Sequence, residues 1–249
     1  MFYLLAHSQF DSSLGALLSP EEELYSTQIR HEQVKCNWIT GRILIKWLAV
    51  HGQNYSCAVE KNVEGNINLS SCFEKWLASS RQEKKSFRRV CVISRSAAGR
   101  GCAPYIKGLG KAESPLRFSL THVDNLVAAA TSAAHNIGLD LCKPGSVSGA
   151  VIRNFFTENE QRLVNQSAQA EVVSALIWSG KEAAFKASDD CDSSPFIPQN
   201  YELTLSLESS ENLVFPVKGS VIRLNSKDNR REFHVEFTAI ENMILAITE

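Results

Sequence analysis

The sequence lacks any strong excess of charge of one sign. Its 249 residues include 26 lysines and arginines against 27 aspartates and glutamates, which leaves a formal net charge of −1. A chain with this balance has no long-range attraction for nucleic acids or anionic membranes, so an acidic partner must meet a local patch. We therefore expect neither nucleic acid nor membrane among its partners.

Long hydrophobic runs are also missing. The longest, such as residues 126–134, fall well short of the roughly 20 residues that a membrane-spanning helix needs. Residues 1–13 have no basic segment and only a short apolar run, which is unlike a signal peptide. We expect the protein to stay in the cytoplasm.

The seven cysteines include no C-x-x-C pair, and their number is odd. This pattern argues against a disulfide framework and against a zinc ribbon, and it predicts that most cysteines are reduced and buried. A cysteine hydrolase that pairs Cys142 with His122 or His135 has little support, because no nucleophile-elbow pattern surrounds the cysteine.

Apolar residues make up 44% of the chain, enough for a large core in one domain or in two units of about 120 residues. Periodicity and turn signals predict helices and strands in both halves, with neither a repeat nor a low-complexity linker, so the fold class is α+β. The expected strands are 2–8, 88–96, 116–122, 126–133, 136–142 and four antiparallel strands after 200. The expected helices begin at Pro20 and cover 31–50, 73–80, 149–167 and 169–190, and 97–115 should be an extended loop.

One helix carries an unusual second face. Within 169–190, Trp178, Glu182 and Lys186 recur four residues apart, roughly opposite the apolar stripe of the helix. Taken alone, the Glu182 and Lys186 pair is what a solvent-exposed helix face commonly carries. An indole is costly to leave in water, so we expect this face to meet another subunit, the other half of the chain, or a cleft.

The strand at 136–142 also carries an acid. Alternation places Gly138, Asp140 and Cys142 on one face, and Asp140 is expected to point away from the core side.

Four segments together resemble the 4'-phosphopantetheinyl transferase superfamily, closest to its two-lobed, monomeric Sfp-type group. "WSGKEAAFKA" fits the motif W-S/A-x-K-E-A/S-x-x-K, "IGLDLC" fits G-x-D, "FSLTHVDN" is similar to an N-x-S-H-like segment, and "GRILIKWLA" is similar to G-R-x-x-x-R/K. The matching residues include Trp178, Ser179, Lys181, Glu182, Ala183, Lys186, Gly138, Asp140, Thr121, His122, Arg42 and Lys46. The four segments occur in the order that the family has.

The resemblance implies two similar α/β lobes related by pseudo-twofold symmetry, with the active site in the cleft between them. We place the division so that residues 1–123 form the N-terminal lobe and residues 124–249 form the C-terminal lobe with the metal site. Such enzymes transfer the 4'-phosphopantetheine arm of coenzyme A to a serine of an acyl or peptidyl carrier protein and release adenosine 3',5'-bisphosphate. Their carrier proteins serve fatty acid, polyketide or nonribosomal peptide biosynthesis.

By resemblance, Asp140 and Glu182 bind Mg²⁺, with Mn²⁺ as an alternative. Glu182 also accepts the proton of the attacking serine, and Lys186 neutralises charge on the diphosphate. His122 donates to a phosphate oxygen, with Thr121 nearby.

The remaining cofactor-binding residues are basic. Arg42, Lys46 and Arg100 are expected to hold the adenosine and 3'-phosphate end of coenzyme A, because phosphate favours several convergent donors. Without the resemblance, Arg42 and Lys46 would be a solvated helix face. Lys181 either contacts coenzyme A or is solvated.

Two departures from the family pattern favour a second hypothesis. Cys142 stands where many members have a further acid, and a thiol is a poor magnesium ligand. Where many family members have the motif G-K-P, this chain has "CAP" at 102–104. The lysine with which relatives contact coenzyme A is therefore missing. The alternative is therefore a catalytically degraded module that binds coenzyme A or a carrier protein.

Overall fold

The computed structural model describes residues 2–8, 12–51, 67–68, 70–78, 85–93, 105–107, 116–133, 135–188, 195–206, 213–224 and 231–248. The chain divides into two compact units, Met1–His135 and Asn136–Glu249. Each unit contains helices and largely antiparallel strands, so the α+β class is confirmed. The boundary expected at 123/124 falls in the turn of a β-hairpin in the first unit, and the observed division comes after that hairpin.

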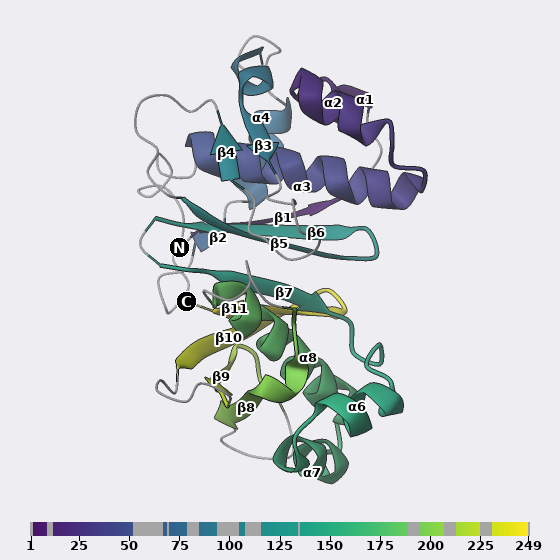
Figure 1. Ribbon diagram of the computed structural model, residues 1–249, viewed down its shortest axis with the longest axis vertical. Helices are drawn as coiled ribbons and strands as arrows, with labels where there is room; N and C mark the ends of the chain where they lie inside the picture. Colours follow the sequence, from purple (N-terminus) through teal and green to yellow (C-terminus); the bar gives the residue numbers. More distant parts are fainter. Residues whose placement is uncertain are drawn as a thin grey trace. The chain divides into compact units, whose positions relative to one another are not determined.

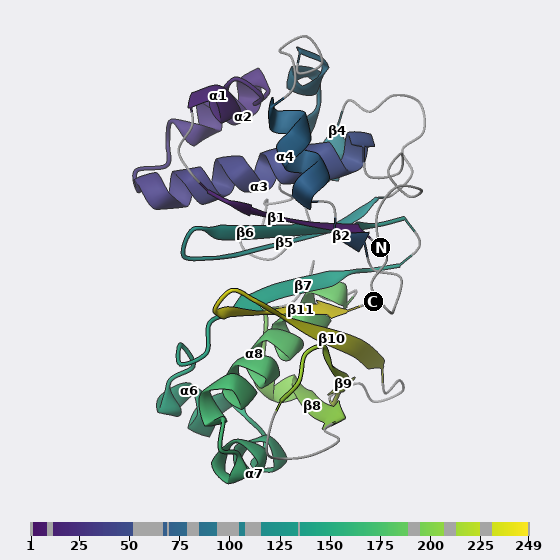
Figure 2. The ribbon, with the colours of Figure 1, turned by 180° about the vertical axis from the view of Figure 1, so that it is seen from behind.

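The first unit has one long helix on a four-stranded sheet. The helix is α3 (Glu32–His51), and the sheet has the order β2-β1-β6-β5. Figure 1 shows α3 along one side of this sheet, and the view from behind agrees (Figure 2). The strands are β1 (Phe2–His7), β2 (Ile67–Asn68), β5 (Arg117–Val123) and β6 (Leu126–Ser132).

The other elements of this unit surround α3. They are α1 (Ser12–Gly15), α2 (Pro20–Ser26), α4 (Ser70–Ala78), a 3-10 turn (Lys85–Arg89) and the antiparallel pair of β3 (Cys91–Ile93) and β4 (Tyr105–Lys107). The strand β4 lies inside the segment that we expected to be a loop. Core side chains of α3, such as Ile43 and Leu44, are fully buried against the sheet and against Phe73 and Trp76 of α4.

The second unit also has one long helix on an antiparallel sheet. Its sheet has the order β7-β11-β10-β9-β8, and the long helix α8 (Ala170–Ala187) packs on β7 and β11. The strands are β7 (Gly138–Cys142), β8 (Tyr201–Ser206), β9 (Val217–Arg223), β10 (Glu232–Ile240) and β11 (Met243–Thr248), all antiparallel to their neighbours. A short 3-10 turn, Pro198–Asn200, precedes β8.

The helix expected at 149–167 is two helices, α6 (Gly149–Phe155) and α7 (Glu158–Gln166). They are separate because Thr157 is an N-cap in extended backbone, where it starts a second helix rather than continuing the first. In the described part of the chain, no helix is long and apolar enough to cross a membrane.

A buried ion pair anchors α3 in the first unit. Ser19 caps α2, and its capping-box partner Glu22 accepts a backbone hydrogen bond from Val92 at 2.9 Å with its other oxygen. The Glu22 carboxylate also pairs with the Lys46 ammonium, which donates to the carbonyl of Leu17 at 3.1 Å. Lys46 is therefore fully buried on α3 and its charge is satisfied inside the unit.

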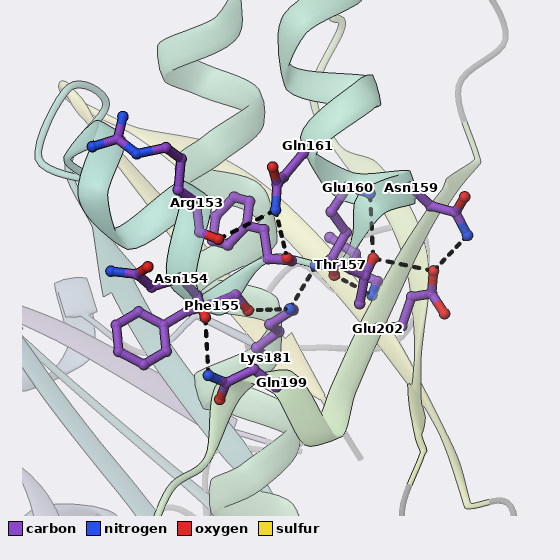
Figure 3. Close-up of polar contacts among 12 residues, drawn as sticks. Arg153, Asn154, Phe155, Thr157, Asn159, Glu160, Gln161, Lys181, Gln199 and Glu202 are labelled. Atoms are coloured by element: carbon purple, nitrogen blue, oxygen red, sulfur yellow. Dashed lines mark hydrogen bonds and ion pairs between the residues drawn. The ribbon is translucent and has the colours of Figure 1, made fainter.

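The second unit has the same arrangement, which Figure 3 shows. Thr157 caps α7, and Glu160 accepts from the backbone of Leu203 at 2.8 Å and pairs with Lys181 of α8 at 2.6 Å. Lys181 donates to the carbonyl of Phe155, two residues before the cap, just as Lys46 donates two residues before Ser19. Each long helix is thus tied to a short helix and to a strand by one buried lysine.

Neither lysine is available for the role expected of it, because both ammonium groups are buried in these pairs. Lys46 neither reaches coenzyme A nor forms the solvated helix face of the alternative reading, and Lys181 is neither at coenzyme A nor solvated. Burial lowers the pKa of Lys181 and raises the pKa of Glu160, and in each case the charge of the partner opposes the shift. Such a pair is costly to desolvate, but removing one partner leaves an uncompensated buried charge.

Replacing Lys46 by Met should therefore lower the free energy of unfolding by about 3 to 5 kcal/mol, because Glu22 would remain buried without its cation. Urea denaturation measures the change. The matched control is Lys75→Met on the exposed face of α4, which should change stability by no more than about 0.5 kcal/mol. Adding Glu22→Gln to Lys46→Met should recover part of the loss, and equal stability of Lys46→Met and Lys75→Met would contradict the structural role.

Candidate functional site

The site in the second unit depends on a close approach of β7 to α8. A Cβ atom placed on Gly138 would lie 1.7 Å from the carbonyl oxygen of Ala183, so only glycine lets the strand lie this close to the helix backbone. Asp140 is two residues further along β7 and therefore lies on the same face as Gly138. The G-x-D spacing thus brings the Asp140 side chain to α8.

The expectation that Asp140 points away from the core side is wrong. Its face of β7 packs on the helix, and the Asp140 side chain is only 6% exposed. The sequence alternation identified the correct set of residues, but both faces of this strand are buried.

Glu182 and Lys186 of α8 meet Asp140 at this face. The Lys186 ammonium lies 2.7 Å from an Asp140 carboxylate oxygen and 3.7 Å from a Glu182 oxygen, and it donates to the carbonyl of Leu139 at 3.0 Å. The side chains of Glu182 and Lys186 are 29% and 27% exposed, so solvent reaches the cluster from the side of α8. Two acids that lie 42 residues apart in the sequence share one cation.

Electrostatics of this cluster follow from its partial burial. Burial and the neighbouring charge of Asp140 raise the pKa of Glu182 to about 7, although Lys186 opposes this shift. Burial lowers the pKa of Lys186, but the charges of Asp140 and Glu182 outweigh burial, so the net pKa is raised. At neutral pH the lysine is charged, while Glu182 is poised between its two protonation states.

Trp178 finds its partners within the second unit. Its ring packs edge-on against Phe155 at 6.4 Å and Phe196 at 5.8 Å between ring centroids. Neither another subunit nor the other half of the chain is needed to cover it. The i, i+4 spacing puts Trp178 beside Glu182, where it opposes the rise in the pKa of the acid.

Cys142 does not act as a further acid. It is 5% exposed and belongs to the apolar core, with its thiol 3.5 Å from the Ser146 hydroxyl. Burial raises the pKa of the Cys142 thiol to about 11, which is the opposite of what an activated nucleophile requires.

The expected residues of the first unit lie on α3 and β5. Arg42 is buried, its guanidinium lies 4.7 Å from the centroid of the Trp38 ring, and burial lowers its pKa. His122 is exposed, but Thr121 is buried and precedes it directly in the strand, so the two side chains point to opposite faces. Arg100 lies outside the described residues.

The donor set of the second unit fits a hard divalent cation. Magnesium commonly takes one or two carboxylates and completes its octahedron with phosphate oxygens and water. Asp140 and Glu182 supply two carboxylates beside a solvent-accessible surface. No group of three or more His, Cys, Asp or Glu side chains that could hold a metal occurs among the described residues, so the site does not resemble a closed structural zinc site.

Sequence reasoning missed two residues that support these sites. Glu160 holds Lys181, the residue directly before Glu182, and the T-x-x-E pattern at 157–160 was the available signal. Asn37 contacts His122 from α3, with its amide nitrogen 3.2 Å from Nδ1 of the histidine. No local pattern marks this contact, because the two residues are 85 positions apart.

Comparison with known protein families gives a match in the second unit. The model of the 4'-phosphopantetheinyl transferase superfamily matches residues 136–243, which include β7 and α8 and therefore all three residues of the acid and lysine cluster. No curated protein sequence matches the chain significantly.

Substitution of Gly138 by Ala should destabilise the second unit, since the added methyl group would overlap the Ala183 carbonyl and force β7 away from α8. We expect a loss of at least about 1 to 3 kcal/mol in urea denaturation. Gly15→Ala is the matched control, because a Cβ there meets nothing within 4 Å. An unchanged stability of Gly138→Ala would show that the close approach does not constrain the strand.

The Cys142 thiol should resist alkylation in the folded protein. With a pKa of about 11, only roughly one thiol in a thousand is ionised at pH 8, and labelling should increase as the pH rises toward 11. Iodoacetamide treatment followed by peptide mass spectrometry measures this, with the half-buried Cys72 as an internal reference. Labelling of Cys142 at pH 8 as fast as Cys72 would instead support a reactive cysteine.

Proposed function

Because residues 136–243 belong to the 4'-phosphopantetheinyl transferase superfamily, we propose that the protein transfers the phosphopantetheine arm of coenzyme A to a carrier protein. The acceptor is a serine hydroxyl of an acyl or peptidyl carrier protein, and adenosine 3',5'-bisphosphate is the other product. The observation that carries the proposal is the cluster of Asp140, Glu182 and Lys186, in which two acids and a cation converge at a solvent-accessible surface.

Asp140 and Glu182 are the proposed ligands of Mg²⁺ or Mn²⁺. When bound, the ion neutralises the diphosphate and the charge that develops on it during phosphoryl transfer. The two acids already lie close together, since Gly138 sets the position of Asp140 and Lys186 contacts both carboxylates.

Glu182 also accepts the proton of the attacking serine. In the reaction the serine oxygen bonds to the phosphorus that carries pantetheine, and the bond from this phosphorus to the bridging oxygen of the diphosphate breaks. The leaving phosphate departs as part of adenosine 3',5'-bisphosphate. The Lys186 ammonium stabilises the charge on the leaving phosphate.

Residues of the first unit bind the rest of coenzyme A in this proposal. His122 donates to a phosphate oxygen, and Arg42 and Arg100 hold the adenosine and 3'-phosphate end. We leave Lys46 out of this set because its ammonium is already paired with Glu22 in the core. Thr121 is left out because its side chain points to the face of the strand opposite His122.

We infer further that the two units are versions of one fold, as the resemblance implies. In support, the first strand of each unit pairs antiparallel with the last, the long helix follows a capped short helix, and two hairpins complete each unit. The Glu22–Lys46 and Glu160–Lys181 pairs support it at the level of single atoms.

Asp140→Asn and Glu182→Gln should each reduce transfer by at least about 100-fold, because each removes a charge that the diphosphate transition state requires. The assay incubates the protein with fluorescent coenzyme A, Mg²⁺ and a panel of carrier proteins, and follows label on the carrier. Chelation by EDTA should stop the transfer, and Mg²⁺ or Mn²⁺ should restore it.

Glu158→Gln, an exposed acid on α7 in the same unit, is the matched control and should keep full activity. Full activity of Asp140→Asn or Glu182→Gln would refute the site. Coenzyme A binding without turnover on any carrier protein would favour the alternative of a degraded binding module.

A further inference from the structure

The surroundings of His122 contain a polar network on the first unit. Asn37 of α3 contacts Nδ1 of His122, and the same Asn37 amide nitrogen donates to the backbone carbonyl of Asp124 at 2.9 Å. Asp124 has a positive φ of 52° in the turn between β5 and β6, a conformation that aspartate tolerates better than most residues. Gln33 lies one turn before Asn37 and faces the same turn.

The packing of α3 on β5 creates this contact. A Cβ on Gly41 would lie 2.8 Å from a terminal methyl of the Leu120 side chain, so α3 and β5 are in direct contact at this point. Asn37 is one helical turn before Gly41, and His122 is two residues after Leu120 on the same face of the strand. The contact of α3 with β5 at Gly41 therefore places Asn37 near His122.

The hydrogen-bond partners fix the orientation of the Asn37 amide. A backbone carbonyl can only accept, so the Asn37 atom beside the Asp124 carbonyl must be the nitrogen. At the other end of the amide, Oδ1 accepts from the Gln33 amide nitrogen at 2.9 Å and from the Ser8 hydroxyl. A flipped amide would set its oxygen against the Asp124 carbonyl.

We propose that Asn37 is a positioning residue that holds His122 in the tautomer with hydrogen on Nε2. Because the Asn37 nitrogen donates toward Nδ1 at 3.2 Å, Nδ1 must accept and the neutral ring carries its hydrogen on Nε2. The ring then presents an N–H donor, which is what a phosphate oxygen of coenzyme A requires. The inference rests on the proposed role of His122 in binding coenzyme A.

Asn37→Asp tests this directly, because it replaces the donor at Nδ1 with an acceptor of the same shape. Long-range ¹H–¹⁵N NMR of the His122 ring, recorded at a pH where the ring is neutral, should show hydrogen on Nε2 in the wild type. In Asn37→Asp the hydrogen should move to Nδ1. A wild-type ring with hydrogen on Nδ1, or a tautomer that is the same in both proteins, would overturn the inference.

Transfer and binding assays separate the positioning role from a purely structural one. Asn37→Asp should lower kcat/KM for coenzyme A by about 10- to 100-fold, as loss of an outer hydrogen-bond partner of a functional histidine does. The double variant Asn37→Asp/His122→Ala should lose little more activity than His122→Ala alone, because the two residues act as one unit. Asn125→Asp makes the same chemical change at an exposed position of the same turn and should leave the tautomer and the activity unchanged.

The outcomes distinguish this inference from the proposed function. If the wild type transfers pantetheine and Asn37→Asp moves the hydrogen without loss of kcat/KM, the positioning role is overturned while the proposed function stands. If the wild type transfers nothing, the proposed function fails, and titration with coenzyme A decides the inference. A shift of the His122 Nε2 resonance that is absent in Asn37→Asp would support it, and no shift in the wild type would overturn it.

Discussion

The separation between β7 and α8 is the constraint on which the candidate site depends. It is set where the backbone at Gly138 meets the carbonyl of Ala183, a contact that leaves no room for a side chain. The carboxylate of Asp140 reaches Lys186 and Glu182 only because the strand and helix lie this close. Backbone packing thus places two acids side by side in a partly buried position. This position raises the pKa of Glu182.

Holding two acids together is unfavourable by itself, so the surrounding structure must resist the repulsion. The Lys186 ammonium offsets it directly, and the ring of Trp178, one turn before Glu182, is held by its packing against Phe155 and Phe196. The rotation of α8 is in turn held by Lys181, whose pair with Glu160 joins the helix to α7 and β8. A helix anchored at the residue next to a proposed ligand has little freedom to turn that ligand away.

Much of this arrangement can be predicted from the sequence, and the predictions that are wrong have physical reasons. The capping box at Ser19, the amphipathic helices and the alternating C-terminal strands are local features, so their elements are confirmed. The resemblance brought together Asp140, Glu182 and Lys186 because their motif spacings are short and specific. The structure places these three residues within one cluster.

Burial was misjudged where a partner comes from far away in the chain. Lys46 and Lys181 were expected to be available to coenzyme A or to solvent, because their acids, Glu22 and Glu160, are more than 20 positions distant. The contact of Asn37 with His122 spans a larger gap of 85 positions. A charge pattern on one helix reports which residues share a face, but only tertiary packing determines whether that face meets water.

The residues that directly follow the two lysine anchors differ in kind. Immediately after the anchor, α8 carries Glu182, whereas α3 carries Trp47, an indole with no exposed surface that packs against Phe73. The position after the anchor is therefore an acid of the candidate site in one unit and a core residue in the other. Because the lysine alone ties each long helix to its short helix, the residue after it can differ without loosening that attachment.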